Sequence, residues 1–238
     1  MSHEHISAAF DRDLEHIQAL VMKMGGLAEA ALNDAATALE TRDADLAERV
    51  RAGDATLDAL EEEINVMSAR LIALRAPTAG DLRAVLTVMK IAAALERCGD
   101  YAKNLAKRSM LLAELPRVDG AAGSIRRMAR QVGLLLRDAL DAYARRDAEL
   151  AREVRARDEE VDQMYGALFR EFVTHMMEDP RQISPCLHLH FIAKNIERVG
   201  DHATGIAEQV IYLVSGALPE EERPKDEGAA LGEPGRGL

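Results

Sequence analysis

The 238-residue sequence has no tryptophan, only 3% aromatic residues and just two cysteines. It also lacks an apolar run near the roughly 18 residues that a membrane-spanning helix needs. Residues 1–10 do not combine a basic region with an apolar block, so we expect no signal peptide and a cytoplasmic protein. Few aromatic side chains, together with abundant alanine, leucine, glutamate, arginine and aspartate, favour long helices packed through small and aliphatic residues.

Several sequence motifs of enzymes are also absent. The chain contains no glycine-rich phosphate loop, no nucleophile elbow, no Cys-x-x-Cys and no Glu-x-x-His, the ligand pair of ferritin-like di-iron enzymes. We therefore expect no catalytic residues and no site for an organic cofactor. The net charge of −11 argues against broad contact with nucleic acid and leaves cations or basic protein surfaces as partners.

One stretch of the chain occurs twice. Residues 86–108 align with residues 187–209 at an offset of 101, and nine of the 23 aligned positions are identical. The shared centre is Glu-Arg-x-Gly-Asp, which runs from Glu96 to Asp100 and again from Glu197 to Asp201. On a helix, this spacing places two carboxylates one turn apart on the same face. Like charges at this spacing and a glycine inside a helix both disfavour helix formation, so their duplication indicates a binding role. The two cysteines, Cys98 and Cys186, do not correspond in this repeat, and valines occupy the equivalent positions, so we expect small core residues rather than a disulfide.

A second acidic pair is duplicated as well. Residues 42–58 match residues 146–162 at an offset of 104, with ten identities in 17 positions. The match aligns Asp54 and Asp58 with Asp158 and Asp162, again four residues apart. The alternative interpretation of all these pairs is a solvated acidic edge, neutralised by neighbouring arginines, with the glycines allowing a close contact between helices.

Apolar residues recur at three- and four-residue steps between short connections, which predicts an all-α protein. We expect two tandem three-helix bundles, with six long antiparallel helices and an internal pseudo-repeat. The expected helices cover about residues 5–40, 44–75, 82–115, 124–145, 147–177 and 182–215, with Asp43 and Asp81 as N-caps. The first bundle should occupy residues 1–117 and the second residues 118–216. Residues 217–238 are rich in glycine, proline and glutamate and should form a disordered tail.

Each half therefore offers four carboxylates from two helices. Carboxylate-only sets suit magnesium, manganese, calcium or iron, and they also accept zinc. His202 and His190 lie near the second motif and are candidate nitrogen ligands, although a lone histidine is more often solvated or packed. The candidate metal ligands are Asp54, Asp58, Glu96 and Asp100 in the first half, and Asp158, Asp162, Glu197 and Asp201 in the second.

From residue 7 to residue 214 the chain resembles the PhoU family of phosphate-transport accessory and regulatory proteins. The residues that carry the resemblance are Ala94–Ala106, Asn195–Ala203, and the turn Arg75-Ala76-Pro77 with Ala79 and residues 81–83. The resemblance implies two three-helix bundles and acidic Glu/Asp-x-x-x-Asp motifs that bind metal ions, including multinuclear iron or zinc clusters. By position, these motifs are Glu96 with Asp100 and Glu197 with Asp201, and less distinctively Asp54 with Asp58 and Asp158 with Asp162. The chain departs from the family at Ala94, often acidic there, so we expect the first site to lack a peripheral ligand or contact.

The resemblance also implies a non-enzymatic negative regulator of the phosphate-starvation response. Such a protein links the ATPase subunit of a phosphate ABC transporter to a sensor histidine kinase. It would be cytoplasmic, held at the inner membrane only through these partners, and could form a homodimer. Two alternatives remain open: a metal-binding or metal-storage bundle, and a purely structural helical scaffold. Neither the identity nor the number of the metal ions follows from the sequence.

Overall fold

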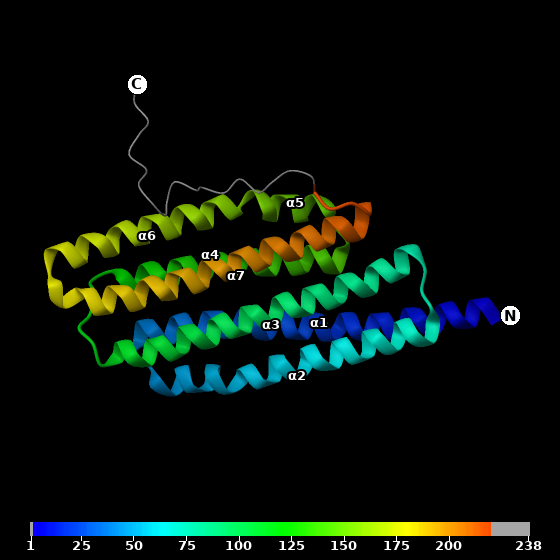
Figure 1. The fold of residues 1–238 in the computed structure, drawn as a ribbon, viewed down its shortest axis with the longest axis horizontal. Helices are drawn as coiled ribbons and strands as arrows, with labels where there is room; N and C mark the ends of the chain where they lie inside the picture. Colours follow the sequence, from blue (N-terminus) through cyan, green and yellow to red (C-terminus); the bar gives the residue numbers. More distant parts are fainter. Residues whose placement is uncertain (1, 220–238) are drawn as a thin grey trace, which may run out of the picture.

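The computed structural model describes residues 2–219 and places nearly all of them in helices that run side by side along the long axis (Figure 1). The expected tail lies outside the described residues from residue 220 onward. Within residues 2–219, no helix combines the length and apolar character that crossing a membrane requires. The elements are α1 (Ser2–Thr41), α2 (Ala44–Arg75), α3 (Ala79–Ala113), α4 (Ala121–Arg145), α5 (Ala148–Ala156), α6 (Asp158–Glu178), the 3₁₀ turn η1 (Pro180–Gln182) and α7 (Ile183–Ser215).

The helices form two bundles that are joined along equivalent helices. In the first half α1, α2 and α3 pack on one another, and in the second half α7 packs against α4, α5 and α6. The halves meet where α1 contacts α4 and where α3 contacts α7. Along the α1–α4 contact, Glu29 pairs with Arg137 and Glu40 with Arg126, so these two helices run antiparallel. The all-α fold of two three-helix bundles is thus confirmed, while the boundaries at residues 117 and 216 stay a prediction.

The core is built mainly from aliphatic side chains, as the composition suggested. Cys98 and Cys186 are buried in this core as free thiols. Burial raises the pKa of Cys98 to about 12, so this thiol stays protonated and unreactive near neutral pH. The largest fully buried side chains are Phe172, Ile17, Met24, Leu32, Ile64, Ile91, Leu95, Leu105, Ile125, Met128, Leu135 and Leu136.

Two local features differ from the sequence prediction. The fifth expected helix is divided at Arg157 into α5 and α6, which continue in one row in Figure 1. The Arg157 guanidinium reaches across to Asp138 on α4, with 2.5 Å between Nη1 and Oδ2, and this tertiary contact accompanies the break. The N-cap of α3 is Thr78 rather than Asp81, because the helix begins at Ala79 and Asp81 lies within its first turn.

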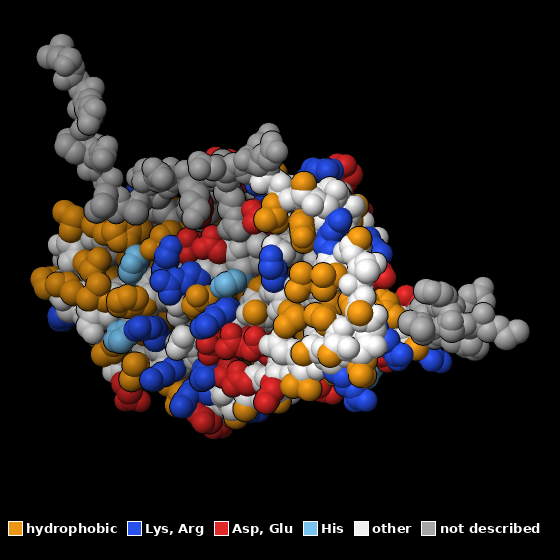
Figure 2. Space-filling model, turned by 45° about the vertical axis from the view of Figure 1, so that its right-hand side comes forward, with side chains coloured by type: hydrophobic (Ala, Val, Ile, Leu, Met, Phe, Trp, Pro, Cys, Tyr) orange, Lys and Arg blue, Asp and Glu red, His pale blue; other side chains and the backbone are white. Residues whose placement is uncertain are grey.

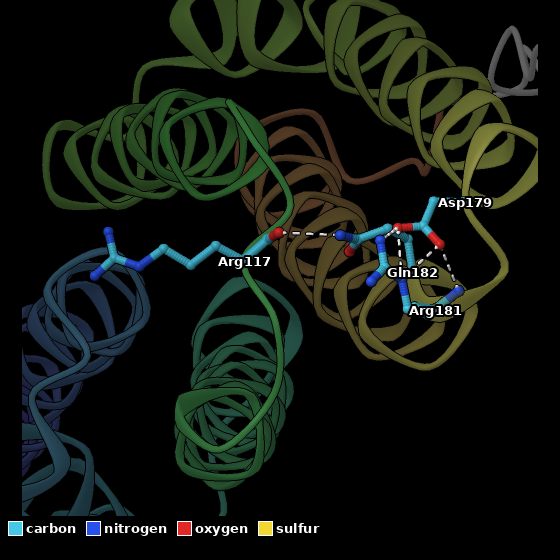
Figure 3. Close-up of polar contacts among 4 residues, drawn as sticks. All are labelled: Arg117, Asp179, Arg181 and Gln182. Carbon is cyan, nitrogen blue, oxygen red and sulfur yellow. Dashed lines mark hydrogen bonds and ion pairs between the residues drawn. The ribbon is translucent and has the colours of Figure 1, made fainter.

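The connection between the halves, residues 114–120, is held against the corner between α6 and α7 (Figure 3). Gln182 Nε2 donates to the carbonyl oxygen of Arg117 at 3.3 Å. The corner itself is fixed by Asp179, whose carboxylate accepts from the backbone nitrogen of Arg181 at 3.0 Å and pairs with its guanidinium. The Arg117 side chain extends from the connection on the side away from Gln182.

The glycines of the repeated motif allow the helices to approach closely. A Cβ atom at Gly99 would overlap Leu57 Cδ1 on α2, and a Cβ atom at Gly200 would lie 3.2 Å from Val161 Cγ1 on α6. The close helix contact expected from these glycines is therefore present in both halves. It brings the helix carrying Glu96 against α2, and the helix carrying Glu197 against α6.

We predict that Gly99→Val destabilises the protein by about 1–3 kcal/mol, because the added side chain overpacks the contact with Leu57. The control is Gly26→Ala on α1, where a Cβ atom meets nothing within 4 Å. Gly26→Ala should stabilise the protein by up to about 1 kcal/mol through helix propensity alone. Urea unfolding monitored by circular dichroism measures both changes, and equal effects of the two variants would contradict the close-contact interpretation.

Candidate metal centres

Every buried charged side chain within residues 9–219 is a carboxylate of the repeated motifs. Within residues 9–219, only Asp54, Asp158 and Glu197 are charged and buried, with exposed fractions of 5%, 7% and 9%. Burying a charge is costly unless it is paired or bound. A solvated acidic edge would expose these side chains, so burial argues against that alternative for these three positions.

In the first half, α2 and α3 bring together Asp54, Asp58, Glu96 and Asp100, with Lys103 among them. Lys103 Nζ pairs with Asp54 and lies 3.6 Å from Asp100 Oδ1. Arg97 flanks the set on the solvent side, 3.5 Å from Glu96 and 3.6 Å from Asp100. We call these four carboxylates the first centre.

In the second half, α6 and α7 bring together Asp158, Asp162, Glu197 and Asp201, which we call the second centre. Asp158 Oδ1 accepts a hydrogen bond from the buried Thr204 hydroxyl at 3.1 Å. Lys194 Nζ lies 2.7 Å from Glu197 Oε1. Figure 2 shows acidic side chains gathered in the middle of one face, with lysine and arginine beside them and hydrophobic side chains toward both ends.

The two centres differ at one equivalent position. Lys103 and Thr204 correspond in the repeat, and each contacts the equivalent buried aspartate, Asp54 or Asp158. The first centre thus contains its own cation where the second has only a hydroxyl. Sequence reasoning missed this difference, although both residues lie three positions after the motif aspartate and hence on its helix face.

The electrostatics show that the carboxylates of each centre act on one another. Burial, and then the neighbouring Asp100, raise the pKa of Glu96, while Arg97 opposes them. In the second centre, burial raises the pKa of Asp162 to about 6, with further contributions from Asp158, Glu197 and Asp201. Burial also raises the pKa of Glu197, against the lowering effect of its bond to Lys194. Carboxylates within each centre are therefore close enough to repel one another, and a bound cation would relieve that repulsion.

The donors fit a hard cation, but they are not preassembled. Glu197 Oε2 is buried and has no hydrogen-bond partner, so an oxygen donor is available in the second centre. In the described part of the chain, however, no three histidine, cysteine, aspartate or glutamate side chains converge tightly enough to form a ready metal site. Binding would require the carboxylates to draw together around the ion. Without a metal ion, protonation of a carboxylate is the other way to reduce the negative charge of the centre.

The candidate histidines lie outside the second centre. His190 packs among Tyr165, Phe169 and Phe191, and burial lowers its pKa. His202 stacks on Tyr101 with ring centroids 5.7 Å apart and lines a hollow of about 400 Å³ with Glu61 and Glu96 of the first half. Ala94, the position where the chain departs from the PhoU pattern, lines the same hollow.

The raised pKa of Asp162 predicts how the stability of metal-free protein depends on pH. Because its folded-state pKa, about 6, exceeds the ordinary value of 3.8, the folded state binds the proton more tightly than the unfolded state. The stabilising contribution is complete below pH 4 and is lost as pH rises through about 6. Asp162→Asn should therefore raise the melting temperature of chelator-treated protein at pH 7 and flatten its rise between pH 7 and 5. Differential scanning calorimetry tests this against Glu153→Gln, an exposed control, and an unchanged pH profile would contradict it.

Comparison with known proteins gives consistent matches along most of the chain. The PhoU domain family matches residues 21–109 and 125–210. A protein of Rhizobium meliloti named phosphate-specific transport system accessory protein PhoU homolog is 47% identical over 95% of this chain and 96% of its own length. A protein of the same name from Caulobacter vibrioides is 47% identical, covering 93% and 96%. The crystal structure of PhoU from Pseudomonas aeruginosa superposes with a TM-score of 0.84 at 41% identity, covering 87% of this chain and all of that one. The phosphate transport system regulatory protein PhoU from Streptococcus pneumoniae gives a TM-score of 0.82 at 29% identity, covering 89% and 100%.

Proposed function

The chain belongs to the PhoU family, and we propose on that basis that it is a non-enzymatic negative regulator of the phosphate-starvation response. Its partners would be the ATPase subunit of a phosphate ABC transporter and a sensor histidine kinase. Support for the transport connection comes from the names of the matched relatives, which describe accessory proteins of phosphate transport. It would act in the cytoplasm, reaching the inner membrane through the transporter.

We further propose that both centres bind metal ions, with iron, zinc, manganese or magnesium as candidates. The observation that carries this part is the burial of Asp54, Asp158 and Glu197, the only buried charges within residues 9–219. The second centre would use Asp158, Asp162, Glu197 and Asp201 as oxygen donors. A bound ion would supply positive charge to a strongly acidic region and fix the two helices of each centre relative to each other.

An adaptor of this kind works through surface chemistry rather than bond making. A cation at each centre would neutralise carboxylates there, and so change the charge that a partner meets at that part of the surface. The helices themselves are long and packed along their whole length, which suits a rigid scaffold. Metal occupancy would therefore switch affinity for a partner without a large change in shape.

The test is a phosphate-starvation reporter in a bacterium from which this gene has been removed. Wild-type protein should restore repression in high phosphate, and the variant with Glu96→Gln, Asp100→Asn, Glu197→Gln and Asp201→Asn should fail to do so. Purified transporter ATPase subunit and kinase should each bind the wild-type protein in a pull-down. Repression by the four-site variant at wild-type level would refute a role for metal in regulation. Failure of wild-type protein to restore repression or to bind either partner would refute the regulatory function itself.

A further inference from the structure

A basic groove runs along the contact between α1 and α4, away from both metal centres. The groove has a volume of about 620 Å³, and small side chains form its floor, including Ala36, Thr37 and Gly133. One wall carries four arginines of α4, which the periodicity places on a single helix face: Arg126, Arg127, Arg130 and Arg137. We call this feature the arginine groove. With a rise of 1.5 Å per residue, its arginines span about 16 Å.

This positive charge is not required by the fold. The chain as a whole carries a net charge of −11, whereas the lining of the groove has four arginines and two glutamates, Glu29 and Glu40. At the offset of 104, the equivalent residues of α1 are Met22, Lys23, Gly26 and Asn33, which include one cation in place of four. Because α1 serves the same packing role with one cation, four arginines are not needed for the helix to pack, and those that do not pair with α1 need another explanation.

Two of the four arginines already hold carboxylates of α1. Arg126 pairs with Glu40 at one end of the groove, and Arg137 pairs with Glu29 through two of its nitrogens at the other. Between them, Arg127 donates only to the Ser124 hydroxyl, at 2.7 Å. Arg130 is exposed and makes no ion pair or hydrogen bond with any residue from 9 to 219. Among residues 9–219, no carboxylate therefore pairs with Arg127 or Arg130.

The groove continues into a hollow whose lining combines apolar residues with the charged residues Arg42, Arg117 and Asp119. This hollow, of about 400 Å³, shares Glu40, Gly123 and Arg127 with the arginine groove and is lined further by Leu39, Leu112, Val118 and Leu189. It lies beside the connection between the halves, where Arg117 also lines it and extends away from Gln182 (Figure 3). A ligand that lay along the groove would thus contact guanidinium groups along its length and the leucines and valine of the hollow at one end.

We propose that the arginine groove docks an acidic segment of a partner protein. Carboxylates of the segment pair with Arg127 and Arg130, because guanidinium matches carboxylate geometry, and an apolar side chain beyond them enters the hollow beside Leu189. A single small anion would leave most of the row uncovered. The chain's own tail also carries glutamates, at residues 220–222, and the test below includes it as a competitor. Binding of an acidic segment does not depend on the regulatory function proposed above, but the role of that binding in the cell rests on it.

The test measures binding of a short fluorescein-labelled helical peptide with two glutamates one turn apart followed by a phenylalanine, using full-length protein. Fluorescence anisotropy should show binding that falls with added salt. Arg127→Gln with Arg130→Gln should weaken binding about tenfold, since two exposed charge pairs are lost. The matched control, Arg49→Gln with Arg152→Gln, removes the same charge from exposed positions outside the groove and should leave binding unchanged.

Four results would each overturn the proposal. These are no binding of the acidic peptide, equal binding of a peptide with glutamines in place of glutamates, equal loss in the Arg49/Arg152 control, and displacement of the peptide at comparable concentration by inorganic phosphate or by a synthetic peptide of residues 220–238. The last result would assign the groove to a small anion or to the chain's own tail. The assay uses purified protein and does not measure phosphate regulation, so a negative result would not contradict the proposed regulatory function.

A cellular measurement identifies the occupant. A photo-crosslinking residue at Leu134, which lines the groove and is 37% exposed, should capture one protein through an acidic segment that mass spectrometry locates. The same residue at Val66 on α2, 62% exposed and outside the groove, should not capture that protein. Capture of a second copy of this chain, or of a segment without acidic residues, would contradict docking of an acidic partner.

Discussion

Glu197→Gln combined with Asp201→Asn is expected to weaken cation binding at the second centre by more than about 100-fold. Even groups outside the ligand shell commonly cost 10- to 100-fold when they are replaced, and these two would contact the ion directly. Glu197 is also the residue whose buried Oε2 atom lacks a hydrogen-bond partner. Its replacement by a neutral amide removes the charge that makes this oxygen a strong cation donor.

Elemental analysis of purified protein, loaded with each candidate metal and then dialysed, measures the effect. Glu62→Gln with Glu63→Gln provides the control, since both glutamates are exposed and lie outside the centres. The control should keep the wild-type metal content. Wild-type content in the Glu197/Asp201 variant would show that the second centre is not a metal site, and its carboxylates would then be part of an interaction surface.

Lys103→Thr is expected to strengthen cation binding at the first centre, and Thr204→Lys is expected to weaken it at the second. The Lys103 ammonium group already pairs with Asp54 and lies 3.6 Å from Asp100 Oδ1, so it competes with a metal ion for the same oxygens. Each substitution installs the residue that the other half has at the equivalent position. We expect cation affinity to change at least about tenfold, upward in Lys103→Thr and downward in Thr204→Lys, because one whole charge is removed or added among the ligands.

Lys103→Thr should also carry a cost in stability that metal reverses. Asp54 is only 5% exposed, and without Lys103 its charge loses a hydrogen-bonded partner. Since the lysine side chain is 43% exposed and solvent screens the pair, we expect a loss of about 1–3 kcal/mol in metal-free protein. Added cation should recover part of this loss by mass action.

Calorimetric titration of metal into chelator-treated protein, together with thermal unfolding, tests both parts. Lys107→Thr, an exposed lysine one turn further along α3, is the matched control and should change neither quantity. If Lys103→Thr binds metal no better than wild type, the lysine does not occupy a cation position, and the difference between the two centres has another meaning.

The fold could be predicted from the sequence because its main signals are local and duplicated. Apolar periodicity predicted the helices, and the two acidic repeats showed that the halves are equivalent. Gly99 and Gly200 correctly indicated close contacts between helices. The division of the fifth helix could not be predicted, because it accompanies an ion pair between Arg157 and Asp138 on another helix. Local propensity carries no information about such a partner.

The candidate centres were predicted as sets but not in their internal chemistry. Spacing places Lys103 and Thr204 on the motif face, yet spacing alone does not say whether a lysine reaches the carboxylates or extends into solvent. The arginine groove was missed for a related reason. It exists because α1 and α4 lie against each other, and one sequence does not specify which helices of the two bundles meet.

The antiparallel contact between equivalent helices makes this chain resemble a homodimer whose subunits have been fused. In a dimer of identical subunits, each contact on the two-fold axis would join a residue to its own copy. Here Tyr101 stacks on His202, its equivalent in the other half, and the two residues differ. Fusion keeps the halves together at any protein concentration and lets each side of the interface change independently. That freedom accounts for a lysine in one centre against a threonine in the other, and for arginines on only one of two corresponding helices.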